Sequence, residues 1–267
     1  MLPADHALDV QLAASAVARP RPRTESRQFY VWMSYACAAI AFLGFTPTYW
    51  APVASGSFAG APVLHLHGLL FSAWTLLFVA QARFAATGRF EHHRALGLIG
   101  ISLATAMLFA GVMVAVASIE TGVARGNGDH ARAFSIVPVT IIVSFAVIVA
   151  AALANIRRPD VHMRLMLVAA VSVLPPAVAR IVFLLLAPPG GGPGAGNLPP
   201  VEMTLVPALL TDLLLLVAIG HDWRTRGRPH RVYVITGLAL LAVQIARVPL
   251  AYTSAWRAVT DWLLRFS

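Results

Sequence analysis

The chain has 267 residues, of which 58% are hydrophobic and only 12% are charged, whereas a soluble globular domain carries about 25% charged residues. Its formal net charge of +9 comes from arginine alone, because the sequence contains no lysine. The arginines stand between apolar runs, without a platform of aromatic residues for stacking on bases. This composition excludes an ordinary soluble domain, argues against a nucleic-acid partner and predicts a lipid bilayer as the surroundings.

Residues 1–28 are polar, with prolines and four arginines toward their end. A signal peptide places an apolar stretch directly after a short basic start, and this segment has none. We expect it to be a flexible cytoplasmic tail. The single cysteine, Cys37, follows in the first apolar run, where it has no partner for an internal disulfide.

Seven apolar runs follow the tail, and each approaches or exceeds the roughly 20 residues that a helix needs to cross the hydrocarbon core. They cover residues 29–50, 62–86, 93–119, 133–155, 161–187, 201–221 and 231–249. None alternates between polar and apolar residues as transmembrane strands do. The sequence therefore predicts an all-α fold, a seven-transmembrane helical bundle over residues 29–249.

The arginines predict the direction in which this bundle is inserted. Most of them gather in the tail and in alternate connections: Arg19, Arg21, Arg23, Arg27, Arg83, Arg89, Arg94, Arg157, Arg158, Arg164, Arg224, Arg226, Arg228 and Arg231. Basic residues accumulate in cytoplasmic loops. We therefore expect a multi-pass protein of the bacterial inner membrane with a cytoplasmic N-terminus.

Residues 250–267 form a short amphipathic segment after the last apolar run. Trp256, Val259 and Trp262 fall on one helical face, whereas Arg257 and Asp261 fall on the other. This pattern predicts a helix that lies in the outer membrane interface and is too short to be an eighth span.

Five histidines stand at the ends of apolar runs that the predicted topology places on the cytoplasmic side: His92, His93, His162, His221 and His230. Glu91, Asp160 and Asp222 stand beside them. Neutral imidazoles from facing helices ligate haem b or, with carboxylates, a transition metal. A bound cofactor with a redox role is the leading hypothesis, and the alternative is that these histidines face headgroups or cap helices.

His65 and His67 form a second candidate metal pair near the outer end of the second run. No other run carries an outer-side histidine, so this pair is the weaker candidate. Phe71, Trp74 and Phe78 follow His67 at steps of three and four residues, so these side chains share one helical face. Such a face is typical of a helix-packing seam.

Ionisable residues inside the apolar runs suggest a different function. Arg180 and Asp212 lie on neighbouring antiparallel runs and are expected to form an ion pair. Gln81, Gln244 and Arg247 are further intramembrane polar residues, and the last two, with Glu202 and His67, are expected to extend a polar outer cavity. Such a site indicates a transporter or a small-molecule binder, and a structural subunit of a membrane complex or a homo-oligomer is a third hypothesis.

Pro175 and Pro176 lie in the middle of the fifth run. Proline lacks an N–H group and clashes with the preceding turn, so we expect a kink at this point. Broken helices occur in transporters and around buried ligands.

Four segments carry a family resemblance: residues 64–74 (LHLHGLLFSAW) with Gln81, residues 93–97 (HRALG), residues 157–166 (RRPDVHMRLM) and residues 222–230 (DWRTRGRPH). In these segments the chain resembles a family of uncharacterised bacterial multi-pass membrane proteins, and more loosely some membrane domains of unknown function. The resemblance implies a helical bundle and brings no activity with it. It draws attention to His67, Gln81, His93, His162 and His230.

Overall fold

A computed structural model describes residues 24–186 and 198–266, and in these residues the fold is helical throughout, with no strand. The elements are α2 (Thr24–Phe45), a π-helical turn (Thr46–Trp50), α3 (Ala51–Ala54), α4 (Pro62–Ala86), α5 (Phe90–Ala124), α6 (Gly128–Phe134), α7 (Ile136–Ala154), α8 (Pro159–Ser172), α9 (Pro175–Leu186), a 3-10 turn (Val201–Thr204), α10 (Leu205–Arg226), α11 (Arg231–Leu250), α12 (Ser254–Leu263) and a final 3-10 turn (Leu264–Phe266). Residues 1–23 of the predicted tail lie outside the described residues, and α2 begins before the tail was expected to end.

The long helices confirm the expected helical membrane architecture. Six helical segments are long and apolar enough to cross a membrane, and the bent pair α8 and α9 makes a seventh if it is one span. Large apolar side chains cover the outside of the bundle, for example Leu98 and Leu185, which are 70% and 76% exposed. An apolar surface of this extent fits a lipid environment and not water.

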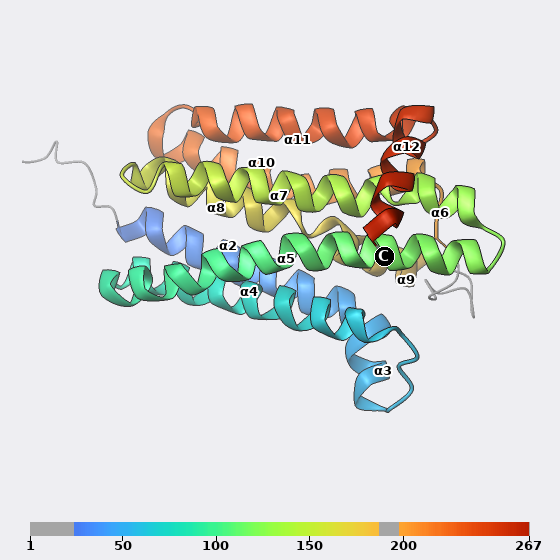
Figure 1. The fold of residues 1–267 in the computed structure, drawn as a ribbon. Helices are drawn as coiled ribbons and strands as arrows, with labels where there is room; N and C mark the ends of the chain where they lie inside the picture. Colours follow the sequence, from blue (N-terminus) through green and yellow to red (C-terminus); the bar gives the residue numbers. More distant parts are fainter. Residues whose placement is uncertain (1–23, 187–197, 267) are drawn as a thin grey trace, which may run out of the picture.

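Successive long helices run in opposite directions, so alternate connections meet at the same end of the bundle (Figure 1). The start of α2 and the connections 87–89, 155–158 and 227–230 all lie at the left of Figure 1. We call this the arginine-rich end, because most of the arginines counted above flank these connections. The short helices α3, α6 and α12 lie toward the opposite end.

Helix α8 occupies the centre of the bundle, where it packs against α2, α7, α10 and α11. Its second half is buried on every side: Leu165, Leu167, Val168, Ala169, Ala170, Val171 and Ser172 are all shielded from solvent. A helix surrounded by other helices needs apolar residues around its whole circumference. This explains why the run after Arg164 has no polar face.

Between α8 and α9 the chain bends by 41°. Pro175 and Pro176 have no N–H to donate to the carbonyls of Val171 and Ser172 four residues earlier. The Val171 carbonyl instead accepts from the N–H of Leu174 at 3.1 Å, in a tighter turn. The expected proline kink is thus confirmed, and we call residues 172–175 the helix break.

Helix α2 crosses α9 at very close range where it carries Gly44. A Cβ atom at Gly44 would stand 2.4 Å from the carbonyl oxygen of Ala177. A real Cβ does not approach a backbone oxygen this closely, so this crossing requires glycine. The contact holds the first half of α9 against α2.

The terminal helix α12 has the expected amphipathic pattern, and its charged face turns toward α6. Arg132 donates to Asp261 at 3.0 Å, Arg257 pairs with Asp129, and the Trp256 indole donates to the Arg132 carbonyl at 2.9 Å. These contacts tie the end of the chain to the segment between α5 and α7.

Candidate functional site

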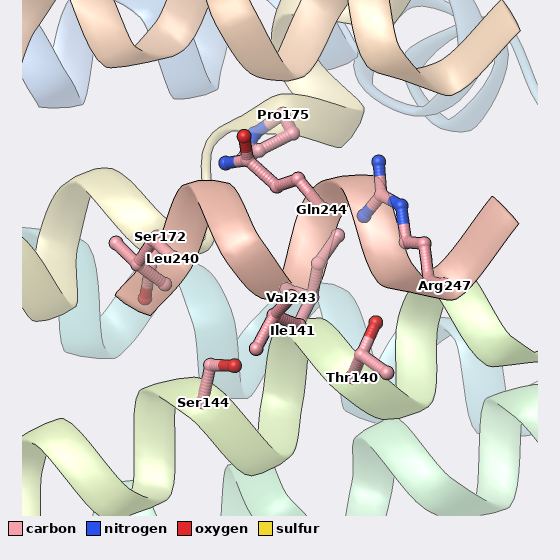
Figure 2. A pocket seen from close by; sticks show the side chains of 9 residues that line it. All are labelled: Thr140, Ile141, Ser144, Ser172, Pro175, Leu240, Val243, Gln244 and Arg247. Carbon is pink, nitrogen blue, oxygen red and sulfur yellow. The ribbon is translucent and has the colours of Figure 1, made fainter. Parts of the chain in front are cut away.

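The helix break borders a small cavity between α7, α8, α9 and α11, with both polar and apolar side chains in its lining (Figure 2). Its lining consists of Thr140, Ile141, Ser144, Ser172, Pro175, Leu240, Val243, Gln244 and Arg247. The space available to the centre of a water molecule is about 20 Å³. One water needs about 10–15 Å³ by this measure, so the cavity admits one water-sized group.

Gln244 projects from α11 toward Pro175 in Figure 2 and is only 7% exposed. Its Nε2 donates to Oδ1 of Asp212 on α10 at 3.4 Å, and its Oε1 is buried without a hydrogen-bond partner. Because a carboxylate attracts the NH₂ side of the amide, the oxygen must face away from Asp212. Gln244 thus brings an unused hydrogen-bond acceptor to the cavity lining.

Arg247 stands one turn further along α11 and is 2% exposed. Its Nη2 donates to both the carbonyl and the hydroxyl oxygen of Thr204, at 3.1 and 2.9 Å, whereas its buried Nε has no partner. Asp212 lies within electrostatic reach, but the ion pairs of the described residues do not include one between Asp212 and Arg247. Arg247 therefore brings a positive charge and an unused donor.

The expected ion pair between Arg180 and Asp212 is not formed. Arg180 points instead toward the end of α2 and the π-helical turn after it: its Nε donates to the Thr48 hydroxyl at 3.0 Å, and its guanidinium carbon lies 4.3 Å from the Phe45 ring centroid. Asp212 faces Gln244 of α11. The two residues occupy differently directed faces of neighbouring helices, which sequence order alone does not reveal.

Two further residues expected near an outer polar cavity do not line this one. Glu202 is exposed and accepts from the Tyr252 hydroxyl at 3.2 Å. His67 tilts against Phe71, with ring centroids 4.1 Å apart, and its Nδ1 is buried without a partner. The other member of the outer pair, His65, is exposed and hydrogen-bonds the Tyr49 hydroxyl at 3.2 Å.

At the arginine-rich end the structure brings together two of the five predicted histidines. His93 of α5 and His162 of α8 have ring centroids 6.4 Å apart and nearly perpendicular planes, at 82°. Each directs Nδ1 to a backbone carbonyl, that of Gln81 at 3.3 Å for His93 and that of Ala152 at 2.8 Å for His162.

The side chains of the other three histidines that were predicted on the cytoplasmic side have other neighbours. His92 is exposed beside the Phe84 ring, and His221 stacks on Phe29 at 3.8 Å. His230 caps α11 by accepting from the Val232 N–H, and its Nε2 lies 3.4 Å from the Asp160 carboxylate. Among the described residues, no group of three or more histidine, cysteine, aspartate or glutamate side chains is arranged to hold a metal ion.

Sequence reasoning missed a fully buried ion pair, between Arg164 and Asp222. Both side chains are 2% exposed, and they stand beside a hydrogen bond of 3.0 Å between the hydroxyl groups of Tyr30 and Tyr233. One signal was present in the sequence. Arg164 shares its helical face with the apolar residues three, four and seven positions later, as an inward-facing residue does.

Comparison with known proteins adds no identity: no family model, curated protein or solved structure matches this chain. The family resemblance of the four sequence segments stays a prediction.

Proposed function

We propose that the protein resides in the bacterial inner membrane with seven spans, the bent pair α8 and α9 serving as one of them. The arginine-rich end, including the start of α2, then faces the cytoplasm, because basic residues accumulate on that side. In this orientation α12 lies at the outer interface. Its charged residues pair with α6, and Val259 and Trp262, 39% and 54% exposed, are available to the headgroup region.

We further propose that the protein binds a small polar solute at the helix break and carries it across the membrane. The observation that supports this function is the cavity itself, because two of its lining residues, Gln244 and Arg247, each have one buried polar atom without a hydrogen-bond partner, Oε1 and Nε respectively. A buried polar group without a partner costs about 1–3 kcal/mol. A ligand that satisfies both atoms recovers this cost.

The two unused atoms define the chemistry of the solute. Gln244 Oε1 requires a donor, and Arg247 Nε requires an acceptor. Small amides and carboxylic acids carry a donor beside an acceptor and fit this pair. Because the present cavity admits one water-sized group, a larger solute requires the helices around the break to move apart, and in transporters such movements occur around substrate sites formed by broken helices.

Solute flux through reconstituted vesicles tests this function. Vesicles containing the full-length protein are exposed to gradients of formamide, acetamide, urea or acetic acid, and the volume change is followed by stopped-flow light scattering. We expect at least one solute to cross several-fold faster than in protein-free vesicles. The Gln244→Leu variant is expected to return that rate to the protein-free level, because it removes the Oε1 acceptor.

Gln81→Leu is the matched control. Gln81 is also a glutamine of a long apolar helix with a buried, partnerless Oε1, but it lies near the arginine-rich end, outside the cavity lining. Its replacement should leave flux unchanged. Equal flux in wild-type and Gln244→Leu vesicles, or no excess over protein-free vesicles for any of the four solutes, contradicts the proposal.

A further inference from the structure

We propose that His93 and His162 form a binding site for a monovalent copper ion at the arginine-rich end, independent of the cavity at the helix break. The two residues come from α5 and α8, which follow the short connections 87–89 and 155–158. The site therefore joins the α4–α5 hairpin to the α7–α8 hairpin.

The backbone fixes which nitrogen of each ring is free. A carbonyl oxygen only accepts, so Nδ1 of His93 must carry the proton that it shares with Gln81, and Nδ1 of His162 the one that it shares with Ala152. In a neutral imidazole Nε2 then holds the lone pair. Metal-bound histidines have this arrangement, in which a carbonyl or carboxylate holds the second ring nitrogen.

The separation of the rings agrees with a shared ion. Two metal–nitrogen bonds of about 2 Å in line place two imidazole centroids about 6 Å apart. The observed separation is 6.4 Å, with the ring planes at 82° to one another. Neither Nε2 has a hydrogen-bond partner among the described residues.

Gln81 holds His93 from both sides. Its side-chain Nε2 donates to the His93 carbonyl at 3.0 Å, while its own carbonyl accepts from the His93 ring. These reciprocal contacts span the α4–α5 hairpin and limit rotation of the ring. A ligand whose backbone and ring are both held loses little freedom when it binds an ion.

The composition of the site selects the ion. The site offers two neutral imidazoles, no third histidine, cysteine or carboxylate completes a group within the described residues, and the Arg94 guanidinium acts electrostatically on His93. Imidazole suits zinc, copper, iron and nickel, but zinc takes four ligands, and the double charge of any divalent ion is disfavoured beside an arginine. Monovalent copper has half that charge and is satisfied by two nitrogen ligands in line.

Competition with a coloured copper chelator tests the site. Full-length protein in detergent is titrated against the Cu(I)–bicinchoninate complex under anaerobic conditions with ascorbate, and an absorption spectrum and metal analysis are recorded on the protein as purified. We expect one Cu(I) bound per chain, and a dissociation constant raised at least tenfold in both His93→Gln and His162→Gln. His92→Gln is the matched control, because His92 is the exposed neighbour of His93. The affinity of this variant for Cu(I) should equal that of the wild-type protein.

X-ray absorption of the wild-type Cu(I) complex provides a readout that needs no variant. Two nitrogen ligands with imidazole scattering support the site even where a histidine variant fails to fold. Sulfur ligands, affinity unchanged in His93→Gln, or tighter retention of Zn²⁺ than of Cu(I) overturns it. A Soret band with stoichiometric iron in the purified protein assigns haem to this end instead and equally overturns the copper site. None of these outcomes depends on solute flux through the helix break.

Discussion

Arg164 and Asp222 form a two-pronged ion pair between α8 and α10: Nε donates to Oδ2 at 2.9 Å and Nη2 to Oδ1 at 2.6 Å. The remaining nitrogen, Nη1, donates to the Asp160 carbonyl at 2.7 Å, and the guanidinium carbon lies 5.8 Å from the Tyr233 ring centroid. Residues of α8, α10 and α11 thus surround the charge of the arginine. This contact fastens the central helix at the arginine-rich end.

Removing one partner of this pair should destabilise the protein strongly. Asp222→Leu leaves the Arg164 guanidinium buried without a carboxylate, which costs about 3–5 kcal/mol in comparable buried pairs. Chemical denaturation in detergent measures the change in unfolding free energy. The double variant Arg164→Met with Asp222→Leu should recover most of the loss, because it removes both charges together.

The exposed pair between Arg257 and Asp129 serves as the control for this prediction. Its side chains are 59% and 82% exposed, so water screens their attraction. Asp129→Asn should change the stability by less than about 1 kcal/mol. A similar small effect for Asp222→Leu contradicts a structural role for the buried pair.

Gly44→Ala should loosen the contact of α2 with α9. The added methyl group meets the Ala177 carbonyl oxygen, a backbone atom that moves only with its helix, so we expect a loss of about 1–3 kcal/mol. Gly237→Ala is the matched control, because a Cβ there meets no atom within 4 Å. Alanine is the better helix former, so the stability of this control should stay equal or rise. Equal denaturation midpoints for the two variants contradict the close crossing.

Asp212→Asn should lower solute flux at least tenfold if the cavity works as proposed. The carboxylate orients the Gln244 amide and offsets the charge of Arg247, and asparagine supplies no negative charge. The flux measurement is the vesicle assay described above. Glu202→Gln is the control, since Glu202 is an exposed carboxylate outside the cavity lining. Unchanged flux in Asp212→Asn contradicts the role of this carboxylate.

His230 makes stability depend on pH. Burial lowers the pKa of its imidazole from 6.5, the neighbouring Arg164 and Arg226 lower it further, and Asp160 raises it. Protonation also removes the Nδ1 lone pair that caps α11 through Val232. Because the unfolded chain then binds the proton more readily than the folded chain, the stability should fall as the pH drops below about 6.5.

The variant His230→Asn isolates this effect, because asparagine caps a helix without titrating. Thermal unfolding of both proteins between pH 7.5 and 5.0 is the measurement. Wild type should lose more stability than the variant below pH 6.5. Parallel pH profiles contradict the prediction.

Much of the fold follows from local patterns. Apolar runs of sufficient length predict the helices, Pro175 and Pro176 predict the break, and the spacing of the arginines predicts which connections share an end. The sequence predicts the boundaries of the helices less accurately. The third run was expected to end at residue 119, but α5 continues through Gly122 to Ala124 and ends just before Gly126, whose φ of 79° is left-handed.

The candidate sites can be predicted from the sequence only in part, because the partner of a polar residue depends on how its helix is rotated about its axis. Arg180 and Asp212 are the arginine and aspartate nearest the middle of neighbouring runs, yet they face α2 and α11. Arg164, counted among the arginines of a connection, lies inside and pairs with Asp222, 58 positions away. Likewise, of the five histidines predicted at one membrane level, only His93 and His162 have rings that lie next to each other.

Hydrophobicity and helix-breaking residues act within a short stretch of chain, so the amino-acid order specifies the apolar helices, the break at the two prolines and the common end of the arginines. The partners of Arg164, Gln244, Arg247 and His93 depend on which helices are neighbours and on the rotation of each about its axis. Those relations arise from packing between segments remote in sequence, such as Gly44 against Ala177, and exist only in the assembled bundle.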